Sequence, residues 1–556
     1  MHWIDWLVLS GTLILISWYG VWKTRNIQDN ASYLGSGRTT PWWAIGLSIM
    51  ATQASAITFI STPGMGYESG LGFVQFYFGL PIAMVIIAYA FVPVYHRLKV
   101  FTAFQFLEER FGMRTRLLTA FLFLVQRGLA AGLTIYAPSI ILSKIVGIPL
   151  QINILIIGIL VIIYTVSGGT EAVTQTHKQQ MAVIFIGLFV AAYFLISGIT
   201  EHVPVSKAIS IANWSDKLHM IDTDFRLDDR YNLWSGLIAG TFLMLSYFGT
   251  DQSQVQRYLS GRSLKEIRTG LYFNAILKIP MQLFILMLGV FVFVFYQFNK
   301  PPAHFDQLAV QHVLSTEKAD SFNLLNHRYD SLYELKRTAL ESGTNEGRFR
   351  ELQSATDTVR REISTVIRNS DYASPVKKQS DFVFITFILQ YLPIGIIGLL
   401  MAVIFSAAMS STAAELNALG TTTVVDFYER LGGKSSVRAS RFSTAAWGVI
   451  AIIFALIAQF MDNLVEAVNI LGSLFYGTVL GIFLVAFYVK RIGGFSVFAA
   501  AIISELVVLA LFYFDDLIVQ ELHFKVEFLW YNLIGCVLVM ALGYLIEMIR
   551  RVAKGS

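Results

Sequence analysis

The chain has 556 residues, of which 55% are hydrophobic and only 14% are charged, and this excludes an ordinary soluble globular protein. The formal net charge of +5 does not indicate nucleic-acid binding, because Lys and Arg are dispersed over many short segments. The single cysteine, Cys536, excludes an internal disulfide framework.

Long apolar runs occupy most of the chain, and a run of about 20 apolar residues spans a bilayer as a helix. About thirteen runs predict an all-α, multi-pass integral protein of the inner or plasma membrane, with the lipid bilayer around it and no nucleic acid as a partner. The predicted spans are 4–22, 42–62, 71–96, 117–145, 151–168, 178–199, 233–251, 270–298, 388–420, 442–461, 466–489, 494–514 and 527–548.

Basic residues gather in every second loop between these runs. Because Lys and Arg stay on the cytoplasmic side during insertion, this pattern predicts an N-terminus outside and a C-terminus inside. The basic residues in these loops include Lys23, Arg97, Lys99, Arg110, Arg257, Arg262, Lys265, Arg430, Lys434, Lys490, Arg491 and Arg550.

Residues 300–384 are polar and lie outside in this topology. Apolar residues recur at spacings of three and four on both sides of the turn-like sequence "ESGTNEG", which predicts an external helical hairpin. An accessory spacer and a gating or partner-docking element are both open for this segment.

Two spans are interrupted by polar residues where a lipid-facing helix should be uniformly apolar. The second contains "ATQAS" and the seventh contains "FGTDQ". Interrupted helices at matching positions of two halves are typical of transporters built from two five-helix repeats of inverted topology. The expected organisation is 1–41 (first helix and linker), 42–199 (first repeat), 200–489 (second repeat with the hairpin) and 490–556 (two further helices). Close helix packing is the alternative explanation for small residues in either span.

The ninth span contains "FSAAMSSTAAELNALG", in which Ala407, Ser410 and Ser411 share one helical face. Two hydroxyls, the carbonyl of Ala407 and two carbonyls from an unwound second span would give a small cation five oxygen ligands. The hydroxyls can also loosen the helix bond of Ala407. The pattern predicts a cation site between the second and ninth spans.

With these features the chain resembles the sodium/solute symporters, a family with the LeuT-like inverted-repeat fold. The matching stretches are "PWWAIGLSIMA", "GMGY", "IYTVSGGTEAV", "TDQSQVQRYLSGRS" and "YLPIGIIGLLMAVIFSAAMSSTAAELNA", and they extend over nearly all of the chain except 300–384. The stretch "YAPSIIL" is more similar to the iodide, monocarboxylate and multivitamin branch than to the hexose branch. The resemblance implies import of a small organic solute driven by sodium ions, by alternating access.

The resemblance also implies residue roles. The family's shared sodium site falls on the carbonyls of Ala51, Ala54 and Ala407 and the hydroxyls of Ser410 and Ser411. The solute-contacting positions of sugar-carrying members fall on Gln53, Thr58, Tyr247 and Lys278.

Further solute candidates lie in the third span, where Gln75 and Tyr77 face the cavity or the membrane interface. The acid that hexose carriers have near Tyr77 is absent.

Members with a second sodium site resemble "WTD" where this chain has Gln175, Thr176 and His177, and they have serines at the positions of Ala413 and Ala414. Because an acidic ligand and both hydroxyls are missing, we predict one sodium ion for each solute.

Arg127 lies inside the fourth span, where an unpaired arginine would be costly, and its planar fork suits a carboxylate. Sialic-acid-carrying members have an arginine in what looks like the corresponding span. Arg127 and Lys278 together favour an organic anion: a carboxylated sugar such as sialic acid, a monocarboxylate or a vitamin. Two structural explanations of Arg127 stay open, a pair with Asp251 or Glu415 and snorkelling. A bond from Lys278 to Asp251 or to a backbone carbonyl also stays open, and a neutral sugar or polyol is the alternative solute.

Two remaining ionisable residues are expected to be ordinary. His177 stands next to Lys178 and is predicted to be a solvated cytoplasmic histidine, while Glu415 is predicted to pair with an arginine of an inner loop. The chain lacks the catalytic motifs that would indicate an enzyme. A transporter-like sensor and a passive channel are the alternatives from other classes.

Overall fold

The computed structural model describes residues 1–556 except 25–32, 35–37, 371–378, 459–463, 523–524 and 554–556. Residues 459–461 of one predicted span therefore lie outside the described residues. The described part of the chain is helical, and its only β-type pairing is an isolated bridge between Thr40 and Gly261.

The elements before the polar segment are α1 (Trp3–Thr24), α3 (Trp42–Gln53), α4 (Ala56–Ser69), η2 (Gly72–Tyr77), α5 (Leu80–Ile86), η3 (Ile87–Phe91), α6 (Val92–Leu98), α7 (Gln105–Phe111), α8 (Met113–Val146), α9 (Leu150–Thr200), α10 (Val205–Trp214), η4 (Ser235–Ala239), α11 (Gly240–Gly249), α12 (Gln252–Leu259) and α13 (Leu264–Phe298). The later elements are α14 (Gln307–Leu314), α15 (Ala319–Glu341), α16 (Glu346–Arg368), α17 (Ser380–Tyr391), α18 (Ile396–Thr422), η5 (Thr423–Tyr428), α19 (Val437–Ile457), α20 (Leu464–Tyr488), α21 (Gly494–Tyr513), α22 (Asp515–Leu522), η7 (Phe528–Trp530) and α23 (Tyr531–Ala553).

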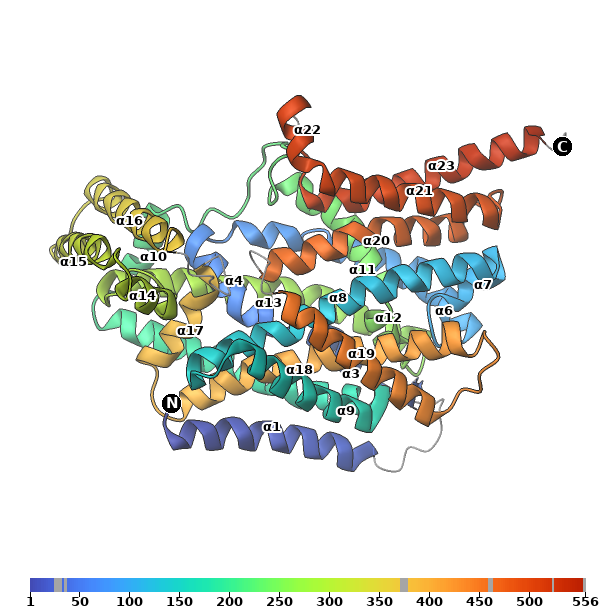
Figure 1. The fold of residues 1–556 in the computed structure, drawn as a ribbon, viewed down its shortest axis with the longest axis horizontal. Coiled ribbons are helices and arrows are strands. Elements are labelled where there is room, and N and C mark those ends of the chain that lie inside the picture. Colours follow the sequence, from blue (N-terminus) through green and yellow to red (C-terminus); the bar gives the residue numbers. More distant parts are fainter. Residues whose placement is uncertain (25–32, 35–37, 371–378, 459–463, 523–524, 554–556) are drawn as a thin grey trace.

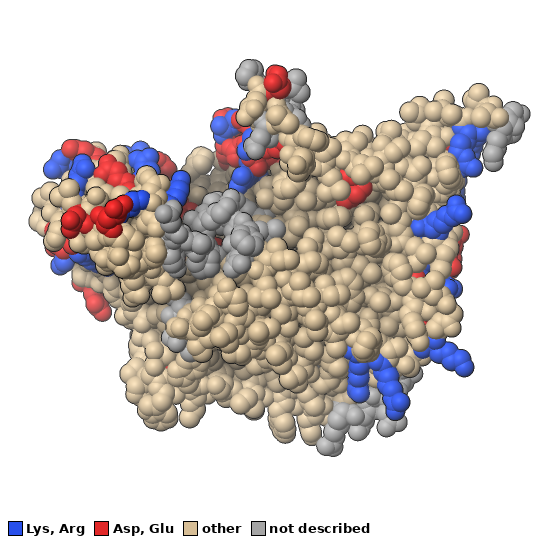
Figure 2. Space-filling view, viewed as in Figure 1, with Lys and Arg blue, Asp and Glu red and all other residues tan. Residues whose placement is uncertain are grey.

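Many of these elements, alone or joined end to end, are long and apolar enough to cross a membrane. Within the described residues ten qualify singly, the bent pair α3–α4 makes an eleventh, and three shorter apolar helices accompany them at Leu150–Ile163, Ser235–Gly249 and Ser380–Tyr391. Figure 2 shows a broad uncharged surface between two ends at which Lys, Arg, Asp and Glu gather. This distribution suits a protein whose middle faces lipid.

Both predicted interruptions are confirmed. The second span is broken between Gln53 and Ala56, where α3 and α4 meet at a bend of 67°. The seventh span is broken at Thr250 and Asp251, between α11 and α12, and Asp251 has an extended backbone and caps α12 through the amide of Ser253.

The predicted fifth and sixth spans are two helices that follow one another without a loop between them, divided by a kink at Gly169. α9 runs from Leu150 to Thr200 and changes direction at Gly169, whose φ of 59° is readily adopted only by glycine. The turn therefore needs no polar loop, and the second arm begins well before the predicted residue 178.

The predicted helical hairpin is also confirmed, as α15 and α16. Together with α14 it lies at one end of the molecule, opposite the end that carries the C-terminus (Figure 1). Its own small core includes Tyr329, Val359 and Ile363. Arg360 of α16 donates to the hydroxyl of Tyr67 at 2.8 Å, which connects the hairpin to the far end of α4.

Candidate functional site

The break between α3 and α4 frees two backbone carbonyls. The amide of Ser55 donates to Gln53 at 3.0 Å rather than to Ala51, and the amide of Thr58 donates to Ser55 at 3.0 Å rather than to Ala54. Ala51 and Ala54 are fully buried. Their carbonyl oxygens therefore lack the usual helical partners in an interior where a polar atom needs one.

α18 brings its small polar face against this break. The hydroxyl of Ser410 donates to the carbonyls of Ala51 and Ala407, at 3.0 and 2.9 Å. The hydroxyl of Ser411 also reaches the carbonyl of Ala407, at 3.1 Å. The predicted cation ligands Ala51, Ala407, Ser410 and Ser411 thus form one buried cluster, with the freed carbonyl of Ala54 on the neighbouring broken segment.

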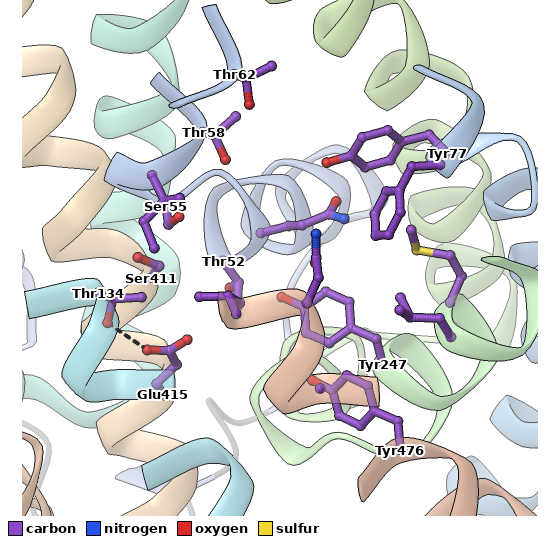
Figure 3. Close-up of a pocket in the computed structure, with 18 of the residues that line it drawn as sticks. Thr52, Ser55, Thr58, Thr62, Tyr77, Thr134, Tyr247, Ser411, Glu415 and Tyr476 are labelled. Carbon is purple, nitrogen blue, oxygen red and sulfur yellow. Dashed lines mark hydrogen bonds between the residues drawn. The ribbon is translucent and has the colours of Figure 1, made fainter. Parts of the chain in front are cut away.

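A cavity of about 800 Å³, part of which is open to solvent, lies beside this cluster. Figure 3 shows Ser411, Thr134 and Glu415 on one side and Tyr77, Tyr247 and Tyr476 on the other. The lining residues are Thr52, Gln53, Ser55, Ile57, Thr58, Thr62, Phe73, Phe76, Tyr77, Arg127, Thr134, Leu243, Met244, Tyr247, Ser411, Glu415, Val468, Asn469, Gly472 and Tyr476.

Five of the predicted solute residues line this cavity: Gln53, Thr58, Tyr77, Arg127 and Tyr247. Gln53 has a buried side-chain oxygen without a hydrogen-bond partner in the described part of the chain. The hydroxyl of Tyr247 accepts from Gln254 at 2.7 Å.

Gln75 and Lys278 do not line the cavity. The side chain of Gln75 donates to the carbonyl of Tyr231 at 2.6 Å and accepts from the amide of Asp222 at 3.0 Å. It thereby anchors the loop that precedes the seventh span, which is a structural task.

Arg127 belongs to a buried network that draws on four parts of the fold. Its guanidinium pairs with Asp251 at the α11–α12 break and, at 3.1 Å, with Glu415 of α18. It also bonds to the hydroxyl of Tyr476 of α20, which itself donates to Asp251 at 2.8 Å. Two carboxylates therefore already neutralise this arginine, as in the structural pairing left open above.

Lys278 is a fully buried lysine of α13 whose surroundings differ from those of Arg127. Within the described residues its ammonium has no hydrogen-bond or ion-pair partner, and it lies 5.6 Å from the centre of the Tyr77 ring. One helical turn further along α13, Gln282 donates to Thr62 at 3.3 Å. Both Tyr77 and Thr62 line the cavity, so α13 backs this part of its wall.

Two expectations about ionisable residues were wrong. His177 is not solvated but fully buried, because the second arm of α9 begins before it and places its ring between α3 and α18. Glu415 does not pair with an inner-loop arginine. It accepts from Arg127 within the membrane-spanning helices and from the hydroxyl of Thr134 at 2.9 Å (Figure 3).

The contribution of α20 was not recognised in the sequence. Asn469, Gly472 and Tyr476 all line the cavity. Their spacing of three and four places them on one helical face, and a polar residue with a glycine one turn away inside an apolar run is the signal that could have marked it.

The sequence of the chain matches a known family of transporters. The model of the sodium:solute symporter family matches residues 33–317 and 361–504, which is most of the chain. The chain belongs to this family. The unmatched residues 318–360 fall within the predicted hairpin insertion, which explains why the resemblance stops there.

The curated relatives carry several solutes. The chain is 25% identical to the sodium-coupled monocarboxylate transporter 2 of Bos taurus over 86% of its own length and 67% of the relative's. It is 26% identical to the sodium/sialic acid symporter SiaT of Proteus mirabilis over 97% and 94%. It is 29% identical to the human sodium/iodide cotransporter over 52% and 45%.

Among solved structures, a sodium-coupled sialic acid symporter in a substrate-bound, outward-open state has the same fold. Its TM-score is 0.73, with 23% identity over 99% of this chain and 98% of that one. The nucleobase-cation symporter Mhp1 is more distant, with a TM-score of 0.50 and 12% identity over 94% of each chain. The chain is thus a multi-pass transporter of the cell membrane that couples the import of a solute to sodium ions.

Proposed function

We propose that this symporter imports a small organic monoanion, such as a carboxylate, together with one sodium ion. The carbonyls of Ala51, Ala54 and Ala407 and the hydroxyls of Ser410 and Ser411 hold the sodium. The cavity beside them holds the solute against Gln53, Thr58, Tyr77 and Tyr247.

The charges around the cavity support this solute class. The guanidinium of Arg127 and the ammonium of Lys278 offset the two carboxylates, Asp251 and Glu415. When the side chain of Lys278 is protonated, one bound sodium ion leaves the region with one positive charge in excess. A monoanion restores neutrality, and this matters because an uncompensated charge in a low-dielectric interior is expensive.

The observation that carries the proposal is the unpaired ammonium of Lys278. Arg127 has two acidic partners and a tyrosine hydroxyl, whereas Lys278 has only the Tyr77 ring beside it among the described residues. The anionic end of the solute therefore gains most near the wall formed by Gln53, Thr62 and Tyr77. Arg127 keeps the opposite wall in place and contacts the solute as a donor.

The named relatives point the same way, since monocarboxylates, sialic acid and iodide are anions. A neutral sugar or polyol is the second candidate. The hydroxyl and amide groups of Thr52, Ser55, Thr58 and Asn469 around the cavity favour it, because they suit a solute rich in hydroxyl groups.

The finer topology is part of the proposal. The eleven long spans and the short helices at Leu150–Ile163 and Ser235–Gly249 give thirteen crossings, with the N-terminus outside and the C-terminus inside. Repeats at 42–199 and 200–489 then each begin with an interrupted helix, the hairpin is external, and 1–41 and 490–556 flank the core.

The deciding experiment is uptake into proteoliposomes under an inward sodium gradient, with potassium as the control cation. We expect accumulation of one of the tested carboxylates, among short monocarboxylates, sialic acid and pantothenate, and none of hexoses. Accumulation of a hexose alone would overturn the anion and leave the sodium site standing. Sodium currents that do not depend on any solute would indicate a channel instead.

A further inference from the structure

His177 completes a ring behind the proposed sodium site, which consists of three hydrogen bonds and is closed by the backbone of α3 and of Ser410. Its Nδ1 lies 2.8 Å from the hydroxyl of Ser48 on α3, and its Nε2 lies 3.2 Å from the carbonyl oxygen of Ser410 on α18. The hydroxyl of Ser410 donates to the carbonyl of Ala51 at 3.0 Å, and Ala51 is three residues after Ser48 on α3. The ring joins three helices and contains two of the proposed sodium ligands.

The direction of each hydrogen bond in the ring follows from the chemistry of its members. A carbonyl oxygen only accepts, so Nε2 of His177 carries the hydrogen. In the neutral imidazole Nδ1 is then an acceptor, and the hydroxyl of Ser48 donates its hydrogen bond to it. The order is therefore Ser48 to His177, His177 to Ser410 and Ser410 to Ala51, with no donor facing another donor.

The imidazole adds a second link between α3 and α18, beside the direct hydrogen bond from Ser410 to Ala51. Ala51 and Ser410 come from different helices, and a small cation binds tightly only when its oxygens already converge. Groups behind the direct ligands perform this task in other ion sites, where they orient the ligands and reduce the ordering that binding requires. His177 is fully buried and does not line the solute cavity, so it acts on the ligands and not on the solute.

We propose that His177 is a positioning residue that sets the sodium affinity of this symporter. Its imidazole holds α3 and α18 at the separation at which the Ala51 carbonyl and the Ser410 hydroxyl can share one ion. This inference rests on the sodium ligands proposed above. It assigns part of the sodium affinity to a residue that touches neither ion nor solute.

The test compares His177→Ala, His177→Gln and the wild type in proteoliposomes, with radioactive sodium binding measured in the absence of solute. We expect His177→Ala to raise the sodium concentration for half-maximal binding and uptake by roughly 5–10-fold, the equivalent of one buried hydrogen bond. The solute concentration for half-maximal uptake, measured at saturating sodium, should stay within about twofold because the cavity wall is unchanged. His177→Gln keeps a donor for Ser410 and should recover most of the affinity.

Gln180→Ala is the matched control. Gln180 lies on the same helix and is fully buried, and its amide atoms have no hydrogen-bond partner in the described part of the chain. The Gln180→Ala substitution should lower thermal stability but leave the sodium concentration for half-maximal binding unchanged. An equal shift of sodium affinity in Gln180→Ala and His177→Ala would mean that His177 is merely part of the core, and would overturn the proposal.

Two further variants keep the proposal decidable. If His177→Ala does not fold, Ser48→Ala removes the hydrogen bond on the other side of His177 and must also weaken sodium binding. Unchanged sodium binding in Ser48→Ala then refutes the role. Ser411→Ala separates the two levels of inference. If Ser411→Ala leaves sodium binding unchanged, the proposed sodium site is wrong. If Ser411→Ala weakens sodium binding but His177→Ala does not, only the positioning role of His177 is wrong.

Discussion

Single hydroxyl groups carry much of the proposed sodium chemistry. The hydroxyls of Ser410 and Ser411 both turn back onto the carbonyl of Ala407, and Ser410 reaches across to Ala51. Such bonds are weak competitors for a helix, and they keep oxygen atoms close together in a buried place. A cation can replace several of them at once.

The Ser411→Ala substitution tests this cluster. In the described part of the chain, the hydroxyl of Ser411 donates only to carbonyls of its own helix, so the fold should survive its loss. The removal of one oxygen ligand should raise the sodium concentration for half-maximal uptake by about tenfold or more. Uptake measured over a sodium series would show this, and an unchanged sodium dependence would refute the ligand assignment.

Lys278 and Arg127 make a second residue-scale prediction. Lys278→Met removes the unpaired charge at nearly constant length and should reduce carboxylate uptake by about tenfold or more, while Lys278→Arg retains part of it. Arg127→Met leaves Asp251 and Glu415 without their cation, so it should lower thermal stability as well as uptake of every solute. Thermal unfolding and uptake of each variant separate the two residues. If Arg127→Met is stable and loses only carboxylate uptake, Arg127 rather than Lys278 binds the anionic group of the solute.

At the scale of elements, the site depends on how closely α4 approaches α13. A Cβ atom on Gly289 would lie 1.9 Å from the carbonyl oxygen of Pro63, and one on Gly66 would lie 2.3 Å from that of Leu286. The backbones of α4 and α13 are therefore in direct contact, and this contact fixes where Thr58 and Thr62 of α4 lie along the cavity wall.

Gly289→Ala should accordingly displace α4 and cost about 1–3 kcal/mol, because neither backbone can yield easily. We expect a lower unfolding temperature and weaker solute affinity. Gly72→Ala is the control, since a Cβ atom there meets nothing within 4 Å. Equal behaviour of the two variants would show that the α4–α13 contact is not tight.

The hairpin offers a pH-dependent test outside the membrane-spanning helices. Burial lowers the pKa of Lys336 from 10.5 to about 7, and its ammonium nitrogen lies 2.8 Å from the side-chain oxygen of Gln353 across the two helices. Below about pH 7 the folded hairpin must bury the charged form, and this penalty disappears as the pH rises toward 10.5, the unfolded value.

Lys336→Met should therefore stabilise the hairpin most at low pH. The difference in unfolding temperature between the variant and the wild type should be larger at about pH 6 than at about pH 9. Thermal unfolding of both proteins at each pH provides the comparison, and it cancels effects that the two proteins share. A difference that does not vary with pH would contradict the burial of a charged lysine.

For the whole molecule, the charge that moves in one cycle reveals both the stoichiometry and the solute. One sodium with one monoanion carries no net charge, so a tenfold sodium gradient supplies ~1.4 kcal/mol and accumulates the solute about tenfold at any membrane potential. One sodium with a neutral solute also gains ~2.3 kcal/mol from ~100 mV and reaches roughly 500-fold.

We therefore expect uptake of the carboxylate to be insensitive to an imposed potassium diffusion potential. Proteoliposomes clamped at different potentials by a potassium ionophore provide the measurement. Uptake that increases strongly with an inside-negative potential would show that net positive charge enters, as it would with two sodium ions for each monoanion. The single-sodium prediction would then fail.

The sequence by itself determined the membrane class, the helical hairpin, the two interrupted spans and the candidate cation face on α18. These follow from local rules, because apolar run length, helical spacing and polar interruptions act over a few turns of one segment. Membership in the sodium:solute symporter family rests on a match over residues 33–317 and 361–504.

The tertiary structure decided which charges meet. Arg127 is joined to Asp251, Glu415 and Tyr476, which lie more than a hundred residues away in sequence, while Lys278 is left unpaired among the described residues. His177 was placed in solvent because its neighbour in sequence is Lys178, yet its partners come from α3 and α18. Partners of a buried polar group are selected by the packing of distant helices, and no periodicity along a single segment records that choice.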